Sequence, residues 1–333
     1  YLLKKIDKLS HPDDLEGYAE EVAGMIEALT WSGLESVEVG RIVASLNDTV
    51  VQGLLVHVER ELGPPPCRYA WIVFGSEGRG EQALITDQDN ALVFEDDTPE
   101  AREYFARLAQ ETVDGLIRAS FPPCRGGFMA TNWNRPLDEW IRLFERWTTT
   151  PDPQALLEVA NFFDFRTIHG GLDLAPLDDR IREAARKRVF LAHLAKASLG
   201  MRPPLGLFHR IREGESGIDL KAGGLMPIIG IARVHALEAG SDARATIDRL
   251  MAAARAKTLS QEGAETLVEG FRFVFRLRLA AQLAEKRRKE SPDNKIHLES
   301  LSALERRHLK DTFQHIRTMQ EAMSQRFNVG LLG

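Results

Sequence analysis

The 333-residue chain is poor in the residues that mark several common protein classes. It has two cysteines, Cys67 and Cys124, which do not form a CxxC pair, and its nine histidines show no HxxxH or HExxH spacing. These absences argue against a zinc site and suit the reducing cytoplasm. No apolar run approaches the roughly 20 residues of a membrane-spanning helix, and no signal peptide is visible. We therefore expect a cytoplasmic protein without a membrane partner.

An excess of positive charge is also missing. Lysine and arginine total 43 against 49 aspartates and glutamates, a net charge of −6 that argues against a nucleic-acid partner. The basic run Lys286–Lys289 is flanked by glutamates and closes an expected helix, where cations are favoured. The length suggests about two domains of roughly 150 residues. The first residue, Tyr1, is not methionine, which favours a fragment of a longer chain.

Apolar residues at three- and four-residue steps between Val39 and Leu62 predict that the first 62 residues are helical. Gly63-Pro64-Pro65-Pro66 would end these helices, because proline lacks a backbone donor and disfavours helical geometry before it. Short apolar runs then predict strands over 69–74, 91–94 and 126–130.

Helices are expected to dominate the rest of the chain. Thr98 and Pro99 predict the N-cap and first position of a helix, and Ser302 with Glu305 resembles a capping box. Further helices are predicted over 137–147, 153–169, 178–198, 226–239, 242–257, 260–289 and 299–327. The expected fold is α+β, with an N-terminal helical segment (1–66), a small mixed-sheet core (67–135) and a C-terminal all-helical domain (136–333).

The segment between the first two expected strands carries the chemistry. Gly75 would let the backbone approach a phosphate, and the Ser76 hydroxyl could donate to it. Asp87 and Asp89 are two residues apart, so an extended backbone sends both carboxylates to one face, as an Mg²⁺ site for a nucleoside triphosphate needs. Arg79 could neutralise phosphate charge. Each feature alone is typical of an ordinary turn, but their order between two strands is far more specific.

Gly75-Ser76 followed by Asp87-x-Asp89 resembles the signature of the nucleotidyltransferase superfamily that includes DNA polymerase beta. The longer string, Gly-Ser-x-Gly-Arg-x-Glu and then Thr-Asp-x-Asp, resembles the PII uridylyltransferase and glutamine synthetase adenylyltransferase branch. Nearly the whole chain resembles the nucleotidyltransferases found behind cyclic-nucleotide-binding and CBS domains in bacterial signalling proteins. The matching stretches include Gly63-Pro64-Pro65, Trp71, Gly78–Gln82, Asp87–Asn90, Gly127–Asn132, Phe162–Arg166, Asp219–Lys221, Pro292–Asn294 and Leu304–Arg307.

This resemblance implies Mg²⁺-dependent transfer of a nucleoside monophosphate from an NTP to a protein or small-molecule acceptor. It also implies a signalling role, with upstream cyclic-nucleotide-binding or CBS domains as partners. Asp87 and Asp89 would hold the metal and act in catalysis. The resemblance assigns nucleotide contacts to Gly75, Ser76, Arg79 and Glu81.

Such enzymes carry a third carboxylate on a later strand, but the corresponding stretch, Cys124–Met129, has no Asp or Glu. Asp164 is the nearest substitute as a catalytic residue; the alternative is a helical residue paired with Arg166 or another cation. Lys221 lies in a stretch that resembles a Lys-Gly-Gly-Leu motif of the family's helical domain, although it could equally lie in a surface loop. We expect Arg166 and Lys221 to bind nucleotide from the helical side of a cleft, with the N-terminal helices outside it.

Three functions remain open at this point. The chain is an active nucleotidyltransferase, a regulatory NTP-binding module that has lost turnover, or a helical interaction scaffold. The intact Asp87 and Asp89 favour the transferase and the NTP-binding module over the scaffold. The missing third carboxylate favours the NTP-binding module over the active transferase.

Overall fold

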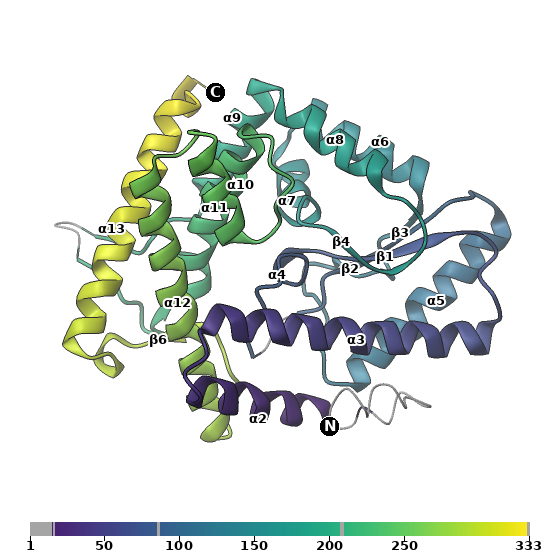
Figure 1. Cartoon of the computed structure of the whole chain (residues 1–333), viewed down its shortest axis with the longest axis horizontal. Coiled ribbons are helices and arrows are strands. Elements are labelled where there is room, and N and C mark those ends of the chain that lie inside the picture. Colours follow the sequence, from purple (N-terminus) through teal and green to yellow (C-terminus); the bar gives the residue numbers. More distant parts are fainter. Residues whose placement is uncertain (1–14, 16, 85–86, 207–209, 332–333) are drawn as a thin grey trace. The chain divides into compact units, whose positions relative to one another are not determined.

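The computed structural model describes Leu15 and residues 17–84, 87–206 and 210–331 (Figure 1). Contacts divide the chain into two compact units. The first comprises Tyr1–Glu145 and Asn161–Arg180, and the second comprises Arg146–Ala160 and Ile181–Gly333. The predicted domain boundaries at residues 66 and 135 stay a prediction. Helices and a small mixed sheet make up the described elements, which confirms the predicted α+β class.

The first unit is built around a four-stranded sheet. Its strands are β1 (Tyr69–Val73), β2 (Asn90–Phe94), β3 (Asn134–Pro136) and β4 (Arg166–Gly170), in the order β3-β2-β1-β4. Strand β1 pairs antiparallel with β2 and β4, whereas β3 runs parallel to β2. Every residue of β1 and β2 is buried, because the strands are apolar apart from Asn90 and are covered on both faces.

Helices α2 (Tyr18–Trp31), α3 (Ser36–Leu62) and α5 (Pro99–Arg118) also belong to the first unit. Helices α3 and α5 pack against each other and against sheet strands (Figure 1). The Thr98 side chain accepts a hydrogen bond from the Ala101 amide, which confirms the predicted N-cap of α5.

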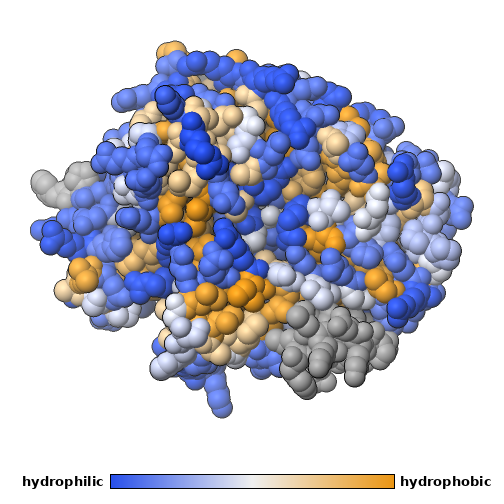
Figure 2. Space-filling model, viewed as in Figure 1, coloured by the Kyte–Doolittle hydropathy of each residue, from blue (hydrophilic) through white to orange (hydrophobic). Residues whose placement is uncertain are grey.

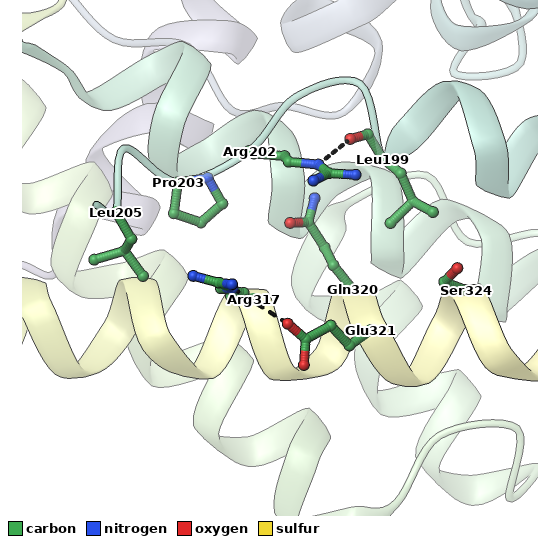
Figure 3. Close-up of a pocket in the computed structure, with 8 residues that line it drawn as sticks. All are labelled: Leu199, Arg202, Pro203, Leu205, Arg317, Gln320, Glu321 and Ser324. Atoms are coloured by element: carbon green, nitrogen blue, oxygen red, sulfur yellow. Dashed lines mark hydrogen bonds and ion pairs between the residues drawn. The ribbon is translucent and has the colours of Figure 1, made fainter. Parts of the chain in front are cut away.

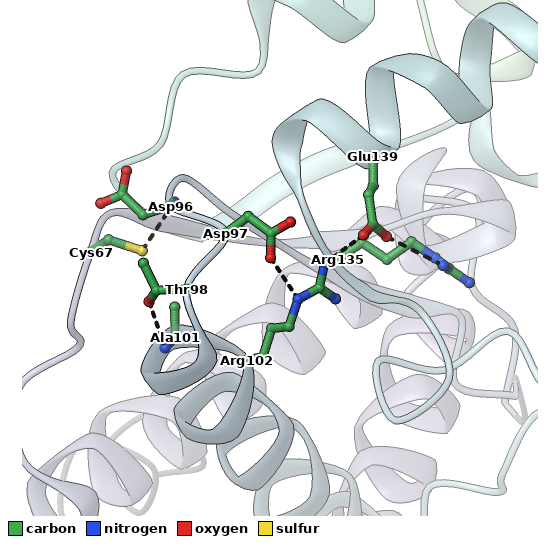
Figure 4. Close-up of polar contacts among 8 residues, drawn as sticks. All are labelled: Cys67, Asp96, Asp97, Thr98, Ala101, Arg102, Arg135 and Glu139. Carbon is green, nitrogen blue, oxygen red and sulfur yellow. Dashed lines mark hydrogen bonds and ion pairs between the residues drawn. The ribbon is translucent and has the colours of Figure 1, made fainter.

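A polar network joins the start of α5 to the connection between β3 and α6 (Leu137–Thr149), as Figure 4 shows. Arg102 of α5 binds both Asp97 and Glu139, and Arg135 of β3 also lies near Glu139. Beneath this surface network, the fully buried Trp140 donates its indole N–H to the Leu92 carbonyl oxygen over 3.2 Å. The network and this contact fasten α6 to the sheet.

The strand predicted over 126–130 is wrong. These residues form an irregular turn, in which Gly127 has a φ of 72° and donates to the Cys124 carbonyl oxygen. The segment still lies beside β2, because the Asn90 amide donates to the Phe128 carbonyl oxygen and Ala130 donates to the Asn90 side chain. A left-handed glycine interrupts the repeating backbone that a strand needs.

The helix predicted over 153–169 is also wrong beyond residue 162. Helix α7 (Pro153–Phe162) ends in a turn, and the chain then enters β4, which pairs with β1. Pairing with a buried strand outweighs the local apolar pattern. The predicted helix over 178–198 is two helices, α8 (Ala175–Ala185) and α9 (Arg188–Ser198).

The second unit is mostly helical. Its main helices after α9 are α10 (Met226–Glu238), α11 (Thr246–Arg255), α12 (Gln261–Arg287) and α13 (Ala303–Arg326). A two-stranded ribbon pairs β5 (Ile218–Asp219) with β6 (Lys295–Ile296), and a π-helical turn (Lys221–Leu225) leads into α10. Helix α10 is buried from Pro227 to Leu237, so the other helices pack around it. The capping box of Ser302 and Glu305 at the start of α13 is confirmed.

Polar and charged residues cover much of the face that Figure 2 shows. Among the described residues, no helix combines the length and the apolar character needed to cross a membrane.

The β1–β4 pairing can be tested at Gly170. This residue has a φ of 94°, and a Cβ added there would lie 2.2 Å from the Tyr69 carbonyl oxygen. We expect Gly170→Ala to lower the free energy of unfolding by more than the roughly 1–3 kcal/mol of backbone strain alone, measured by urea denaturation. The matched control is Gly171→Ala, whose new Cβ would meet nothing within 4 Å. Equal losses in the two variants would contradict the pairing.

Candidate functional site

The turn after β1 brings the two predicted motifs together. Gly75 opens the one-turn helix α4 (Gly75–Gly78) with a φ of 58°. A Cβ on Gly75 would lie 2.6 Å from the Asp89 Oδ2 atom, and the Phe74 amide donates to the Asp89 carbonyl oxygen over 3.0 Å. Glycine is therefore required at this position both for its backbone angle and for the close approach of a carboxylate.

Side-chain exposure alternates along the segment that carries the two aspartates, as it does in an extended chain. Gln88 is buried. Its backbone amide donates to the Pro122 carbonyl oxygen, and its side-chain amide donates to the Phe121 carbonyl oxygen, each over 3.0 Å. Asp87 is exposed and Asp89 partly exposed, so the carboxylates flank an inward-pointing glutamine. Ser76 is also partly exposed. Thr86, which belongs to the predicted motif, lies outside the described residues.

Glu77 is a site residue that the sequence reasoning missed. It is buried, and its Oε2 atom accepts a hydrogen bond from the Asp89 amide over 3.3 Å. Burial, followed by the charge of Asp89, raises the pKa of Glu77 to about 8, and Asp48 adds to this effect. Glu77 occupies the unspecified position of the Gly-Ser-x-Gly string, so the motif gave no signal for it.

Arg166, at the start of β4, meets Asp48 of α3. Its two terminal nitrogens lie 2.7 and 3.0 Å from the Asp48 carboxylate oxygens, and one also donates to the Glu77 carbonyl oxygen over 3.2 Å. Arg166 thus belongs to the sheet unit, not to the helical side as predicted. Its contact with a nucleotide stays a prediction.

Helix α3 contacts this loop and is itself braced by α2, whereas the prediction that the N-terminal helices stay outside the nucleotide cleft stays a prediction. The Tyr18 hydroxyl of α2 donates to Asn47 of α3, whose side-chain amide donates to Gln82, each over 2.8 Å. All three side chains are buried. The loop is therefore held from the N-terminal helices as well as from the sheet.

Arg79 forms a buried ion group with Glu81 and Asp164. Its Nε atom lies 2.7 Å from Glu81 Oε2, and its Nη1 atom lies 2.6 Å from Asp164 Oδ2. Burial alone would lower the pKa of the guanidinium, but the two carboxylates outweigh it and the pKa is raised. A phosphate contact from Arg79 or Glu81 would require this ion group to open.

Asp164 is fully buried, in the turn after α7. A Cβ on Gly78 would lie 2.1 Å from the Asp164 carbonyl oxygen, so the loop packs directly on this turn. These contacts favour the alternative in which Asp164 pairs with a cation, although the cation is Arg79 and not Arg166. A catalytic role for Asp164 stays a prediction.

The Cys124–Met129 stretch closes another side of the aspartate segment. The Cys124 thiol lies against the Asp89 carboxylate, and burial together with that charge raises the pKa of the thiol. The stretch supplies no carboxylate to the site. Among the residues described, no group of three or more His, Cys, Asp and Glu side chains has the arrangement of a metal cluster.

Lys221 lies in the second unit, as the first residue of the π-helical turn, and is partly exposed. The glycines that follow are packing positions, because a Cβ on Gly223 would lie 2.8 Å from Pro204 and one on Gly224 2.8 Å from Val274. Lys221 is therefore helical and does not lie in the surface loop considered above. Its predicted contact with a nucleotide, across a cleft shared with the sheet, stays a prediction.

Two family models match the chain. Residues 20–154 match the model described as "Putative nucleotidyltransferase DUF294", and residues 188–327 match "Putative nucleotidyltransferase substrate binding domain". No curated protein matches it. The two models together span most of the chain, which therefore belongs to a nucleotidyltransferase family.

The Arg79 group generates a stability prediction. Arg79→Ala removes the cation that two buried carboxylates share, so we expect a loss of about 3–5 kcal/mol in the free energy of unfolding. The matched control is Arg102→Ala, since Arg102 also binds two carboxylates but at the surface, where ion pairs contribute little. Both variants would be followed by urea denaturation. A stable Arg79→Ala protein that loses only NTP affinity would instead support the phosphate contact.

Glu77 generates a pH prediction. Its folded pKa of about 8 lies above the ordinary value of 4.5, so the folded state holds a proton that the unfolded state releases. The free energy of unfolding should therefore fall between about pH 4.5 and 8, by up to about 1.4 kcal/mol for each pH unit. Glu77→Gln cannot ionise and should flatten this fall in metal-free thermal melts. The exposed control, Glu103→Gln, should follow the parent protein; identical profiles for all three proteins would refute the assignment.

Proposed function

We propose that the chain is an Mg²⁺-dependent nucleotidyltransferase of the PII-uridylyltransferase-like type. It would transfer a nucleoside monophosphate from an NTP to a protein or small-molecule acceptor. The observation that carries this proposal is the contact between Asp89 and Gly75, with Asp87 on the same side of the extended segment. A glycine-opened turn beside paired carboxylates suits a triphosphate with its metal ion.

The charges around the loop fit a divalent cation. Burial raises the pKa of Glu77 most, and the carboxylates of Asp89 and Asp48 raise it further, so negative groups lie close to Glu77 at this end of the sheet. Asp87 and Asp89 would hold Mg²⁺, which when bound neutralises charge on the phosphates. Glu77 accepts a hydrogen bond from the Asp89 amide and therefore helps to fix the backbone that carries this carboxylate. Ser76, which is partly exposed, would donate to a phosphate oxygen.

A second candidate is a regulatory NTP-binding module without turnover. It is favoured because no carboxylate is available in the role of the third catalytic one. The Cys124–Met129 stretch has none, and Asp164 is committed to Arg79. Neither position offers a free base for an acceptor hydroxyl. The signalling context and the upstream cyclic-nucleotide-binding or CBS partners belong to the proposed function and rest on the family resemblance, whereas the proposed cytoplasmic location rests on the scarcity of cysteine and the lack of a visible signal peptide.

Titration calorimetry with each NTP and Mg²⁺ tests the metal pair. We expect Asp87→Asn and Asp89→Asn each to weaken binding at least roughly tenfold. Even the mutation of a residue that only hydrogen-bonds to a metal ligand costs about 10- to 100-fold in metal affinity. The control is Asp96→Asn, an exposed carboxylate beyond the other end of β2 (Figure 4). Melting temperatures should stay unchanged in all three variants.

The outcomes separate the three functions. Binding with release of pyrophosphate in the presence of an acceptor supports the transferase. Binding without release across a panel of proteins and small molecules supports the regulatory module. No binding of any NTP leaves only the helical scaffold.

A further inference from the structure

The second unit contains a concave site that the nucleotidyltransferase proposal does not use. Its volume is about 470 Å³, within the range of small-molecule sites. Three arginines line it, together with apolar side chains and one glutamate. We call it the arginine pocket and define it by Arg182, Arg186, Arg188, Leu237, Glu238 and Phe327.

The three arginines come from one stretch of chain. Arg182 lies in the last turns of α8, Arg186 in the connection and Arg188 at the first position of α9. Because α8 ends and α9 begins within three residues, the guanidinium groups gather on the same concavity. All three residues are exposed, so a ligand can reach them from solvent.

Their positive charge is only partly balanced. Arg182 pairs with Asp242, at 3.1 and 3.2 Å, and Arg188 donates to the neutral Arg326 carbonyl oxygen over 3.1 Å. Arg186 makes no side-chain hydrogen bond or ion pair with any residue that the structure describes. Arg186 and Arg188 thus line the same concavity without a carboxylate partner among the described residues, which favours an anionic ligand.

The other lining residues of the pocket are apolar side chains and one carboxylate, and they determine what else a ligand can contact. Leu237 and Phe327 supply apolar surface, and Glu238, the last residue of α10, accepts hydrogen bonds from Arg326. Burial alone would raise the pKa of Glu238, but the His235 ring 3.6 Å away and the hydrogen bonds from Arg326 outweigh it and the pKa is lowered. An ionised Glu238 repels a second anionic group and accepts a hydrogen bond from a hydroxyl or amine.

A second concavity in the same unit, about 290 Å³ in volume, is less suited to an anion (Figure 3). Its two arginines are already engaged: Arg202 donates to the Leu199 carbonyl oxygen, and Arg317 pairs with Glu321 over 3.2 Å. Of these two sites, only the arginine pocket combines three guanidinium groups with an apolar wall.

We propose that the arginine pocket binds the phosphomonoester of a small molecule, with the phosphate on the arginines and the remainder over Leu237 and Phe327. A phosphate presents three terminal oxygens to guanidinium donors, whereas a carboxylate presents two. The pocket contains no paired carboxylates, so this binding needs no divalent cation. The site is independent of the Asp87 and Asp89 pair and does not rest on the proposed transfer reaction.

Titration calorimetry of the full chain in low salt with EDTA tests the pocket. The probes are AMP, adenosine as the matched ligand without phosphate, inorganic phosphate and succinate as a dicarboxylate. We expect AMP to bind at least about tenfold more tightly than adenosine or succinate, since bonds between charged partners are the stronger ones. Inorganic phosphate should compete with AMP.

The variants locate the site. Arg186→Ala should weaken AMP at least about tenfold, whereas Arg255→Ala, an exposed arginine at the end of α11, should leave AMP affinity unchanged. Asp89→Asn should also leave it unchanged. The proposal is overturned if AMP does not bind, if adenosine or succinate binds as tightly, if Arg186→Ala has no effect, or if AMP affinity depends on Asp89. Unaltered melting temperatures would show that Arg186→Ala remains folded.

Discussion

The position of the loop after β1 depends on a single buried cation, Arg79. Its guanidinium joins Glu81 of the same loop to Asp164, which is 85 residues further along the chain. Buried charges are tolerated only when they are paired and hydrogen-bonded, so this group admits few alternative arrangements. Gly78 reinforces it, because the absence of a side chain lets the loop lie directly on the Asp164 backbone.

With the loop fixed, the carboxylates near it take up their positions. Asp89 lies against Gly75, Glu77 is buried behind it, and Asp48 reaches the loop through Arg166. The pKa of Glu77 is raised mainly by burial and further by the neighbouring carboxylates of Asp89 and Asp48. Such a site is poorly suited to a triphosphate alone and well suited to one that arrives with a divalent cation. The arginine pocket of the second unit has the opposite charge, so it can hold an anion without metal.

The features predicted correctly are those that depend on neighbouring residues. The apolar runs of β1 and β2, the Thr98 N-cap, the Ser302 capping box and the α+β class follow from short-range patterns. Three predicted elements were incorrect: the strand over 126–130, which the left-handed Gly127 interrupts, the end of the helix over 153–169, which becomes β4 paired with β1, and the single helix over 178–198, which is α8 and α9. Strand β4 forms because it pairs with β1, which lies far away in sequence.

The sequence by itself determined the order of the site: a glycine-serine turn, then two aspartates on one side of an extended segment, then a buried strand. Only the tertiary structure decided which charges meet. Arg79 faces Asp164 and not solvent, Arg166 faces Asp48, and Glu77 is buried beside Asp89. The physical reason is that backbone periodicity acts over a few residues, whereas the energy of a charge is set by burial and by partners that the fold brings from distant parts of the chain.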